Sequence, residues 1–70
     1  MHILVVPRGE FIDYDDFCLR ASGERVSHFF KAVNRIAMEH SSHGSFRIAI
    51  NNGKDAGQEV FHFHVHVLID

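Results

Sequence analysis

The chain has 70 residues, of which seven are basic and nine acidic, giving a formal net charge of −2, and it contains a single cysteine. This balance leaves no basic surface of the kind that binds nucleic acid, and no apolar run approaches the roughly 20 residues that span a bilayer. One cysteine cannot form an internal disulfide, so we expect a small cytoplasmic domain with neither a nucleic-acid nor a membrane partner. Because a chain of this length hides only about 60% of its extended-chain surface on folding, we expect added stability from a homodimer.

The first half of the chain predicts a strand, a polar connection and a helix. Residues 2–7, HILVVP, form a short β-branched run stopped by proline, which is typical of a buried or half-buried strand. Residues 8–17 form a polar connection that carries four acidic residues. From about Ser22, the expected N-cap, to His40 the apolar residues recur at helical spacing, and Gly44 lies beyond the expected end. The apolar stripe consists of Val26, Phe29, Phe30, Val33, Ile36 and Ala37.

The second half predicts two strands joined by a long loop. Residues 45–51 alternate, with Phe46, Ile48 and Ile50 on one face, and residues 51–58, NNGKDAGQ, have the composition of a loop. Residues 59–69 alternate again, which predicts an antiparallel hairpin with the preceding strand. One face carries Glu59, Phe61, Phe63, Val65, Val67 and Ile69, and the other carries Val60, His62, His64, His66 and Leu68. The fold class is therefore α+β, with one main helix on the apolar face of a small antiparallel sheet of about three strands.

Three histidines, His62, His64 and His66, occupy alternate positions of the last predicted strand. Alternate strand residues share a face about 6.6–7 Å apart, so the imidazoles would form a row about 13 Å long. A His-x-His pair can converge on zinc, but the third histidine of a straight strand lies too far away, so a metal site would need another ligand. Candidates for that ligand are His2, His28, His40, His43 or an acidic residue.

The same row suits phosphoryl transfer, because one imidazole can attack phosphorus while its neighbours donate hydrogen bonds to phosphate oxygens. In the preceding loop, Gly53, Ala56 and Gly57 would let backbone N–H groups approach an anion. Asn51 and Gln58 would add neutral donors. The loop lacks the spacing of a Walker-type phosphate cradle. Packing alone explains the row poorly, because each unsatisfied buried imidazole nitrogen costs about 1–3 kcal/mol.

Three segments of the sequence carry a resemblance to a known family. HFHVHVL at residues 62–68 fits a pattern of histidines alternating with apolar residues, and residues 51–68 add an Asn-containing loop and a Gly-Gln turn. HILVVPRG at residues 2–9 is a strand that opens with histidine and ends in Val-Pro-Arg. Together they resemble the histidine triad (HIT) superfamily of nucleotide hydrolases and transferases over nearly the whole chain. The resemblance implies a HIT-like α+β fold.

The resemblance also implies a role for each histidine of the motif. His64 would attack the α-phosphorus and carry the nucleotidyl group on a ring nitrogen, before water releases the nucleoside monophosphate. His62 and His66 would flank it and bind phosphate oxygens, and His2 would support the triad from the neighbouring strand. The implied substrates are purine nucleoside phosphoramidates or dinucleoside polyphosphates, and neither a metal nor another cofactor is required.

Four loop residues are implied to bind the substrate. Asn51 and Gly57 would line the phosphate and ribose side of the pocket, beside Gln58 and Glu59. Glu59 departs from the family, which often has Ser or Thr there to contact the scissile bridging oxygen. A carboxylate at this position would donate a proton when protonated, and would otherwise repel phosphate or point away from it.

The chain begins inside the strand that carries His2, so we expect residues 1–70 to form a single, truncated HIT-like domain. Pairing of an exposed strand with a second chain would complete its sheet. An alternative function is a catalytically weak module that binds a nucleotide or a protein, and a zinc-binding histidine strand is a minor alternative. We expect Cys18 to serve packing rather than catalysis.

Overall fold

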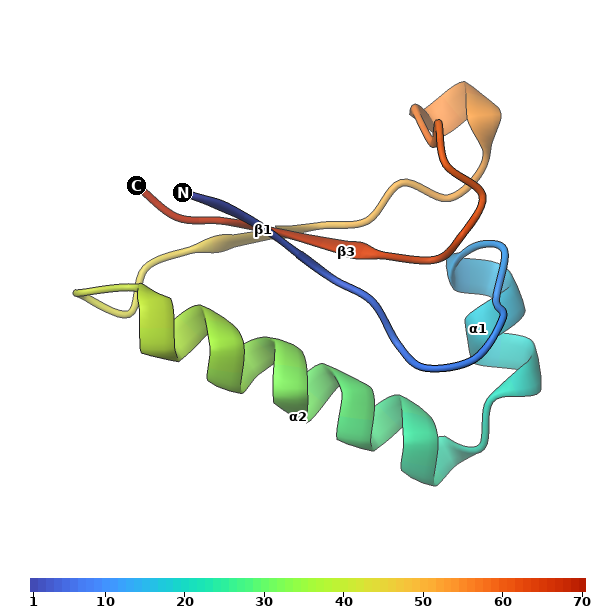
Figure 1. Cartoon of the computed structure of the whole chain (residues 1–70), viewed down its shortest axis with the longest axis horizontal. Coiled ribbons are helices and arrows are strands. Elements are labelled where there is room, and N and C mark those ends of the chain that lie inside the picture. Colours follow the sequence, from blue (N-terminus) through green and yellow to red (C-terminus); the bar gives the residue numbers. More distant parts are fainter.

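The computed structural model covers residues 1–70 and contains three strands and two α-helices (Figure 1). In chain order these are β1 (His2–Val5), α1 (Tyr14–Arg20), α2 (Gly23–His40), β2 (Arg47–Ala49) and β3 (Val65–Leu68), with a short 3-10 turn, η1 (Lys54–Ala56), before β3. The sheet is antiparallel with the order β1-β3-β2, which confirms the α+β class and the pairing of the last two strands. Neither helix combines the length and the apolar character needed to cross a membrane.

The central strand β3 presents different chemistry to its two faces. Val65 and Val67 are fully buried beneath α2, whereas His66 and Leu68 lie half-buried on the opposite face. Antiparallel pairing sets His66 between Leu4 of β1 and Ala49 of β2. Because the side chains of a strand alternate between faces, burying the valines brings the histidine to the face away from the helix.

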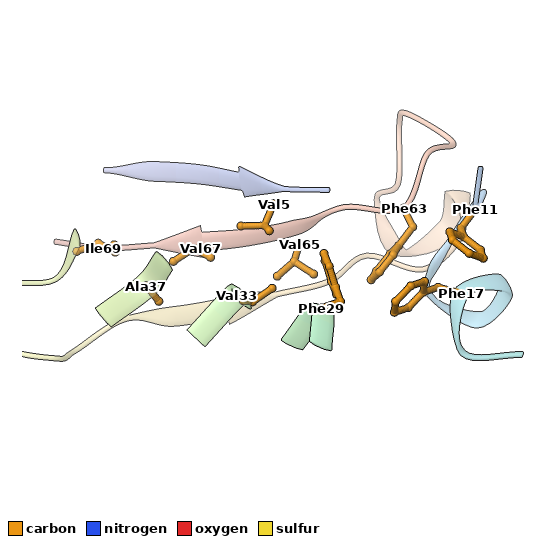
Figure 2. Packing of buried hydrophobic residues seen from close by; sticks show 10 residues of the cluster. All are labelled: Val5, Phe11, Phe17, Phe29, Val33, Ala37, Phe63, Val65, Val67 and Ile69. Carbon is orange, nitrogen blue, oxygen red and sulfur yellow. The ribbon is translucent and has the colours of Figure 1, made fainter. Parts of the chain in front are cut away.

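The core lies between the sheet and α2 and continues toward α1 (Figure 2). It consists of Val5, Phe11, Phe17, Phe29, Val33, Ala37, Phe63, Val65, Val67 and Ile69. The predicted apolar stripe of α2 is confirmed, since Phe29, Val33 and Ala37 are buried and its other members pack against the core. The predicted N-cap is also confirmed, because Ser22 Oγ accepts a hydrogen bond from the Arg25 N–H at 3.1 Å.

The predicted polar connection over residues 8–17 is wrong from Tyr14 onward, because that segment enters α1. Asp13 caps this helix by accepting the Asp16 N–H at 2.8 Å. Asp16 pairs with Arg20 one turn later at 2.6 Å, and this hydrogen bond, with one from the backbone of residue 12, lowers the pKa of Asp16 to about 2. The helix buries Phe17 but leaves Cys18 exposed, so the expectation that Cys18 serves packing is wrong.

The last strand is shorter than the alternation of residues 59–69 predicts. Regular pairing begins at Val65, and the segment before it bends, so that Val60 and Phe61 are exposed rather than Phe61 being buried. The backbone N–H of Phe63 donates to the carbonyl oxygen of Phe11 at 2.7 Å instead of continuing the β2–β3 ladder. The core ring of Phe63 stacks on Phe17 with centroids 4.9 Å apart, which explains why the chain turns toward α1 here.

Candidate active site

Three of the four motif histidines gather on the face of the sheet opposite α2. Nε2 of His2 lies 2.8 Å from Nδ1 of His66, and the two rings have centroids 5.0 Å apart. The rings of His64 and His66 lie 4.9 Å apart in an edge-to-face arrangement. His2 pairs directly with Leu68, which makes His66 its diagonal neighbour on the same face, within reach of a long side chain. Pairing of β1 with β3 therefore brings together residues that are 64 positions apart.

The protonation of His64 follows from its one hydrogen bond. Its Nδ1 lies 2.7 Å from the carbonyl oxygen of His62, and a carbonyl oxygen can only accept a hydrogen bond. In the neutral ring, Nδ1 therefore carries the proton, and Nε2 keeps a free lone pair. This is the tautomer in which Nε2 of an imidazole can act as a nucleophile.

His62 does not continue a straight row of three imidazoles. It lies in the bend before β3, its side chain is exposed, and its carbonyl oxygen rather than its ring contacts His64. The expected row of about 13 Å is therefore wrong, because the strand geometry on which it depends begins only at Val65. Within the structure, the closely packed group is His2, His64 and His66.

The environment of His66 favours its neutral form. Partial burial is the largest cause that lowers its pKa from the ordinary histidine value, followed by the positive charges that His64 and His2 would carry when protonated. Nε2 of His2 and Nδ1 of His66 share one hydrogen bond, in which one of the two nitrogens donates and the other accepts. The His66 ring is fixed on one side by this bond, and its Nε2 remains available to a ligand.

Gln58 is buried and faces the chain rather than the histidines. Its Oε1 accepts the Gly53 N–H at 2.7 Å, and its Nε2 donates to the carbonyl oxygens of Ile12 at 2.7 Å and Val60 at 3.1 Å. Both N–H donors of the carboxamide are thus engaged. This corrects the expectation that Gln58 supplies a free donor to a substrate.

The other loop residues named from the sequence lie at the surface. Asn51, Gly57 and Glu59 are all exposed. Gly57 has φ +94°, a conformation that disfavours any residue with a side chain, and a Cβ built there would lie 3.9 Å from Nδ2 of Asn51. Asn51 and Gly57 are therefore neighbours, as a shared ligand contact requires, but the Gly57 N–H donates to the Lys54 carbonyl oxygen at 3.0 Å and is not a free donor.

No three His, Cys, Asp or Glu side chains converge so as to hold a metal ion, so the zinc alternative has no three-ligand site. The other candidate ligands, His28, His40 and His43, are exposed on α2 or just after it, and Nδ1 of His40 donates to the carbonyl oxygen of Ile36 at 2.9 Å. A hollow of about 720 Å³ lies between the end of β1 and α2, and none of the four motif histidines lines it. A second hollow of about 500 Å³ borders His2 alone among them.

The titration of His66 tests this description of the site. We expect its midpoint, measured by NMR of labelled histidine, to lie below the ordinary value near 6.5. Replacing His64 with Gln removes one repelling charge and raises the midpoint only part of the way, because burial remains the larger cause. The distant exposed variant His43→Gln leaves it unchanged. A His66 midpoint above the ordinary value would contradict the arrangement.

Because the unfolded chain binds this proton more readily, His66 lowers folding stability as the pH falls below the ordinary histidine pKa.

Comparison with known proteins places this geometry in a family. Residues 1–70 match the HIT domain. An uncharacterized HIT-like protein of Rickettsia prowazekii (strain Madrid E) is 41% identical over 69 residues, which cover 97% of this chain and 58% of that protein. An uncharacterized HIT-like protein of Azospirillum brasilense is 43% identical over 67 residues, covering 94% of this chain and 55% of that protein. The chain thus spans less than two thirds of the length of these relatives.

Solved structures agree with the sequence relatives. A HIT family hydrolase from Clostridium thermocellum superposes with a TM-score of 0.80 at 28% identity, covering 97% of this chain and 59% of that one. A histidine triad protein from Clostridium difficile superposes with a TM-score of 0.74 at 38% identity, covering 96% of this chain and 58% of that one. The match over all 70 residues, the shared fold and the clustered histidines together show that the chain belongs to the HIT family.

Proposed function

We propose that the chain is a HIT-type nucleotide hydrolase that cleaves purine nucleoside phosphoramidates or dinucleoside polyphosphates through a covalent intermediate on His64. The observation that carries the proposal is the hydrogen bond from Nδ1 of His64 to the carbonyl oxygen of His62, which leaves Nε2 as the nucleophile. Membership of the HIT family supports a module that binds nucleotides. The reaction needs neither a metal nor another cofactor in this proposal.

The proposed chemistry has two balanced steps. In the first, the Nε2 lone pair of His64 forms a bond to the α-phosphorus while the bond from phosphorus to the leaving nitrogen or oxygen breaks. The leaving group takes the electron pair and a proton from a protonated flanking imidazole. In the second, a water oxygen displaces Nε2, losing a proton to that imidazole and releasing the nucleoside monophosphate. His64 is then free and again protonated on Nδ1 only.

The neighbouring residues would stabilise the charge on phosphorus. Nε2 of His66 can donate to a phosphate oxygen, and His2 orients that ring through the 2.8 Å hydrogen bond to Nδ1. The negative charge of a bound phosphate favours protonation of a flanking imidazole, which can then supply the proton to the leaving group. Asn51 and Gly57 would line the phosphate and ribose side of the site, and Glu59 would lie at the rim near the leaving group.

A catalytically weak module that binds a nucleotide or a protein is the alternative from another class. It is favoured by one observation: His64 lines neither the hollow of about 720 Å³ nor that of about 500 Å³, so neither of them would enclose a substrate at this residue. A substrate outside such a hollow is held less firmly than one in a pocket that covers most of its surface.

Hydrolysis of adenosine 5′-phosphoramidate in the presence of EDTA separates the two functions. We expect turnover by the wild-type chain and a loss of about 10³-fold or more in kcat for His64→Ala, because the nucleophile is removed. His43→Ala, an exposed histidine beyond α2, serves as the matched control and retains full activity. Nucleotide binding without turnover by the folded wild-type chain would support the alternative, and loss of turnover in EDTA would reopen the zinc hypothesis.

We also propose that the protein forms a homodimer through a sheet edge. β1 and β2 are both edge strands, so each presents unpaired backbone groups, and Leu4 and Ile48 expose apolar side chains on them. We expect light scattering at micromolar concentration to give a mass twice that of the 8.0 kDa chain. A mass equal to one chain would contradict the dimer.

A further inference from the structure

Gln58 is the only buried polar side chain between β2 and β3, and it is 4% exposed. Burying a carboxamide is unfavourable unless its donors and acceptor find partners. Here they do, and the partners come from separate parts of the chain: Gly53 at the start of the turn η1, Val60 just beyond it, and Ile12 before α1. A single side chain therefore connects the loop to the segment that leads into α1.

The bonds of Gln58 fall into two groups with different consequences. With Gly53 it forms a closed pair, because its own N–H donates to the Gly53 carbonyl oxygen at 3.0 Å while its Oε1 accepts the Gly53 N–H. This pair closes the turn. Through Nε2 it donates one hydrogen bond to the carbonyl oxygen of Ile12 and one to the carbonyl oxygen of Val60, and so bridges the two groups. This bridge holds the chain that continues toward β3.

The chain between Val60 and Phe63 is thus attached at both ends to the same segment. The Gln58 bridge fixes the carbonyl group of Val60 beside Ile12, and the N–H of Phe63 donates to the carbonyl oxygen of Phe11 at 2.7 Å. Between these two attachments lies His62. Its carbonyl oxygen is the group that accepts the Nδ1 proton of His64.

We propose that Gln58 is a positioning residue for His64: by bridging the carbonyl oxygens of Ile12 and Val60, it holds the His62 carbonyl where the proton of His64 stays on Nδ1. The effect of Gln58 on catalysis rests on the proposed function. The effect of Gln58 on the tautomer of His64 does not rest on it, because the tautomer is a property of the folded chain and can be measured without turnover.

Two variants separate the bridge from the turn. Gln58→Glu keeps an oxygen for the Gly53 N–H but places carboxylate oxygen against the carbonyl groups of Ile12 and Val60. Gln58→Met keeps a similar volume and removes every side-chain hydrogen bond. Asn52→Ala is the matched control, because it removes another bond from the same loop, the 2.8 Å contact of Asn52 Oδ1 with the Asp15 N–H, without touching the bridge.

The first readout is the ¹⁵N signature of His64 at about pH 8, above the ordinary histidine pKa near 6.5. We expect the Nδ1–H tautomer in the wild-type chain and in Asn52→Ala, and a mixture with the Nε2–H tautomer in Gln58→Glu and Gln58→Met. A pure Nδ1–H tautomer in both folded Gln58 variants would overturn the proposal. A change in Gln58→Met alone would assign the effect to the Gly53 pair and would also overturn it.

The wild-type chain provides a test that needs no folded variant. In urea below the unfolding transition, we expect the side-chain N–H groups of Gln58 to begin free exchange together with the loss of the His64 signature. If the Gln58 groups exchange freely while His64 keeps its tautomer, the bridge does not position His64.

Kinetics then connect the inference to catalysis. We expect Gln58→Glu to lower kcat for adenosine 5′-phosphoramidate by about 10²-fold, because small displacements of reacting groups cost this much, with little change in KM. A rise in KM at unchanged kcat would overturn the positioning role and assign Gln58 to substrate binding. An inactive wild-type chain in which the Gln58 variants still shift the tautomer would reject the proposed function but support the positioning role.

Discussion

The alternation of side chains along β3 is the constraint on which the rest of the molecule depends. Val65 and Val67 are fully buried against α2, and burying a valine side chain contributes about 1.5–3 kcal/mol. A slip of one residue would expose them and drive the histidines into the core, where each unsatisfied polar nitrogen costs about 1–3 kcal/mol. The burial of the valines and the exposure of the histidine nitrogens both favour the observed register. The position of His66 on the open face is therefore set by packing on the other face.

The site also depends on contacts between segments that are distant in sequence. β1 brings His2 beside His66, and the segment of Phe11 and Ile12 holds the chain before β3 through Phe63 and Gln58. The first contact orients one imidazole, and the second places the carbonyl group that sets the tautomer of His64. The histidines thus gain their geometry from the two ends of the domain rather than from β3 alone.

The long helix and the buried face of the last strand were predictable, because apolar residues recur there with the helical period of 3.6 and the strand period of 2. α1 was harder, since it has only seven residues. Its start had a recognisable signal, an aspartate N-cap at Asp13 followed three residues later by Asp16, which reads as a variant of the capping box. Its reason to be helical is the burial of Phe17 against rings from three other segments, which local periodicity does not contain.

The sequence also predicted a row of histidines, but not how their side chains are arranged. The alternating pattern continues through Phe61 and His62, yet the chain bends there because Phe63 turns to pack against Phe17 and to bond Phe11. The residue type of Gln58, a neutral hydrogen-bond donor, predicts a contact with a phosphate. Its burial depends on Ile12, 46 residues earlier, and no local pattern reveals that contact.

The central claim is that Nε2 of His64 forms a covalent bond to phosphorus. Its most direct test is to mix the chain with excess adenosine 5′-phosphoramidate, quench within one turnover under denaturing alkaline conditions that spare nitrogen–phosphorus bonds, and measure the protein mass. We expect a gain of one adenylyl group, located by peptide fragmentation on His64 and absent in His64→Ala. Turnover with no such adduct in a time course that captures the first turnover, or an adduct on His62 or His66, would contradict it.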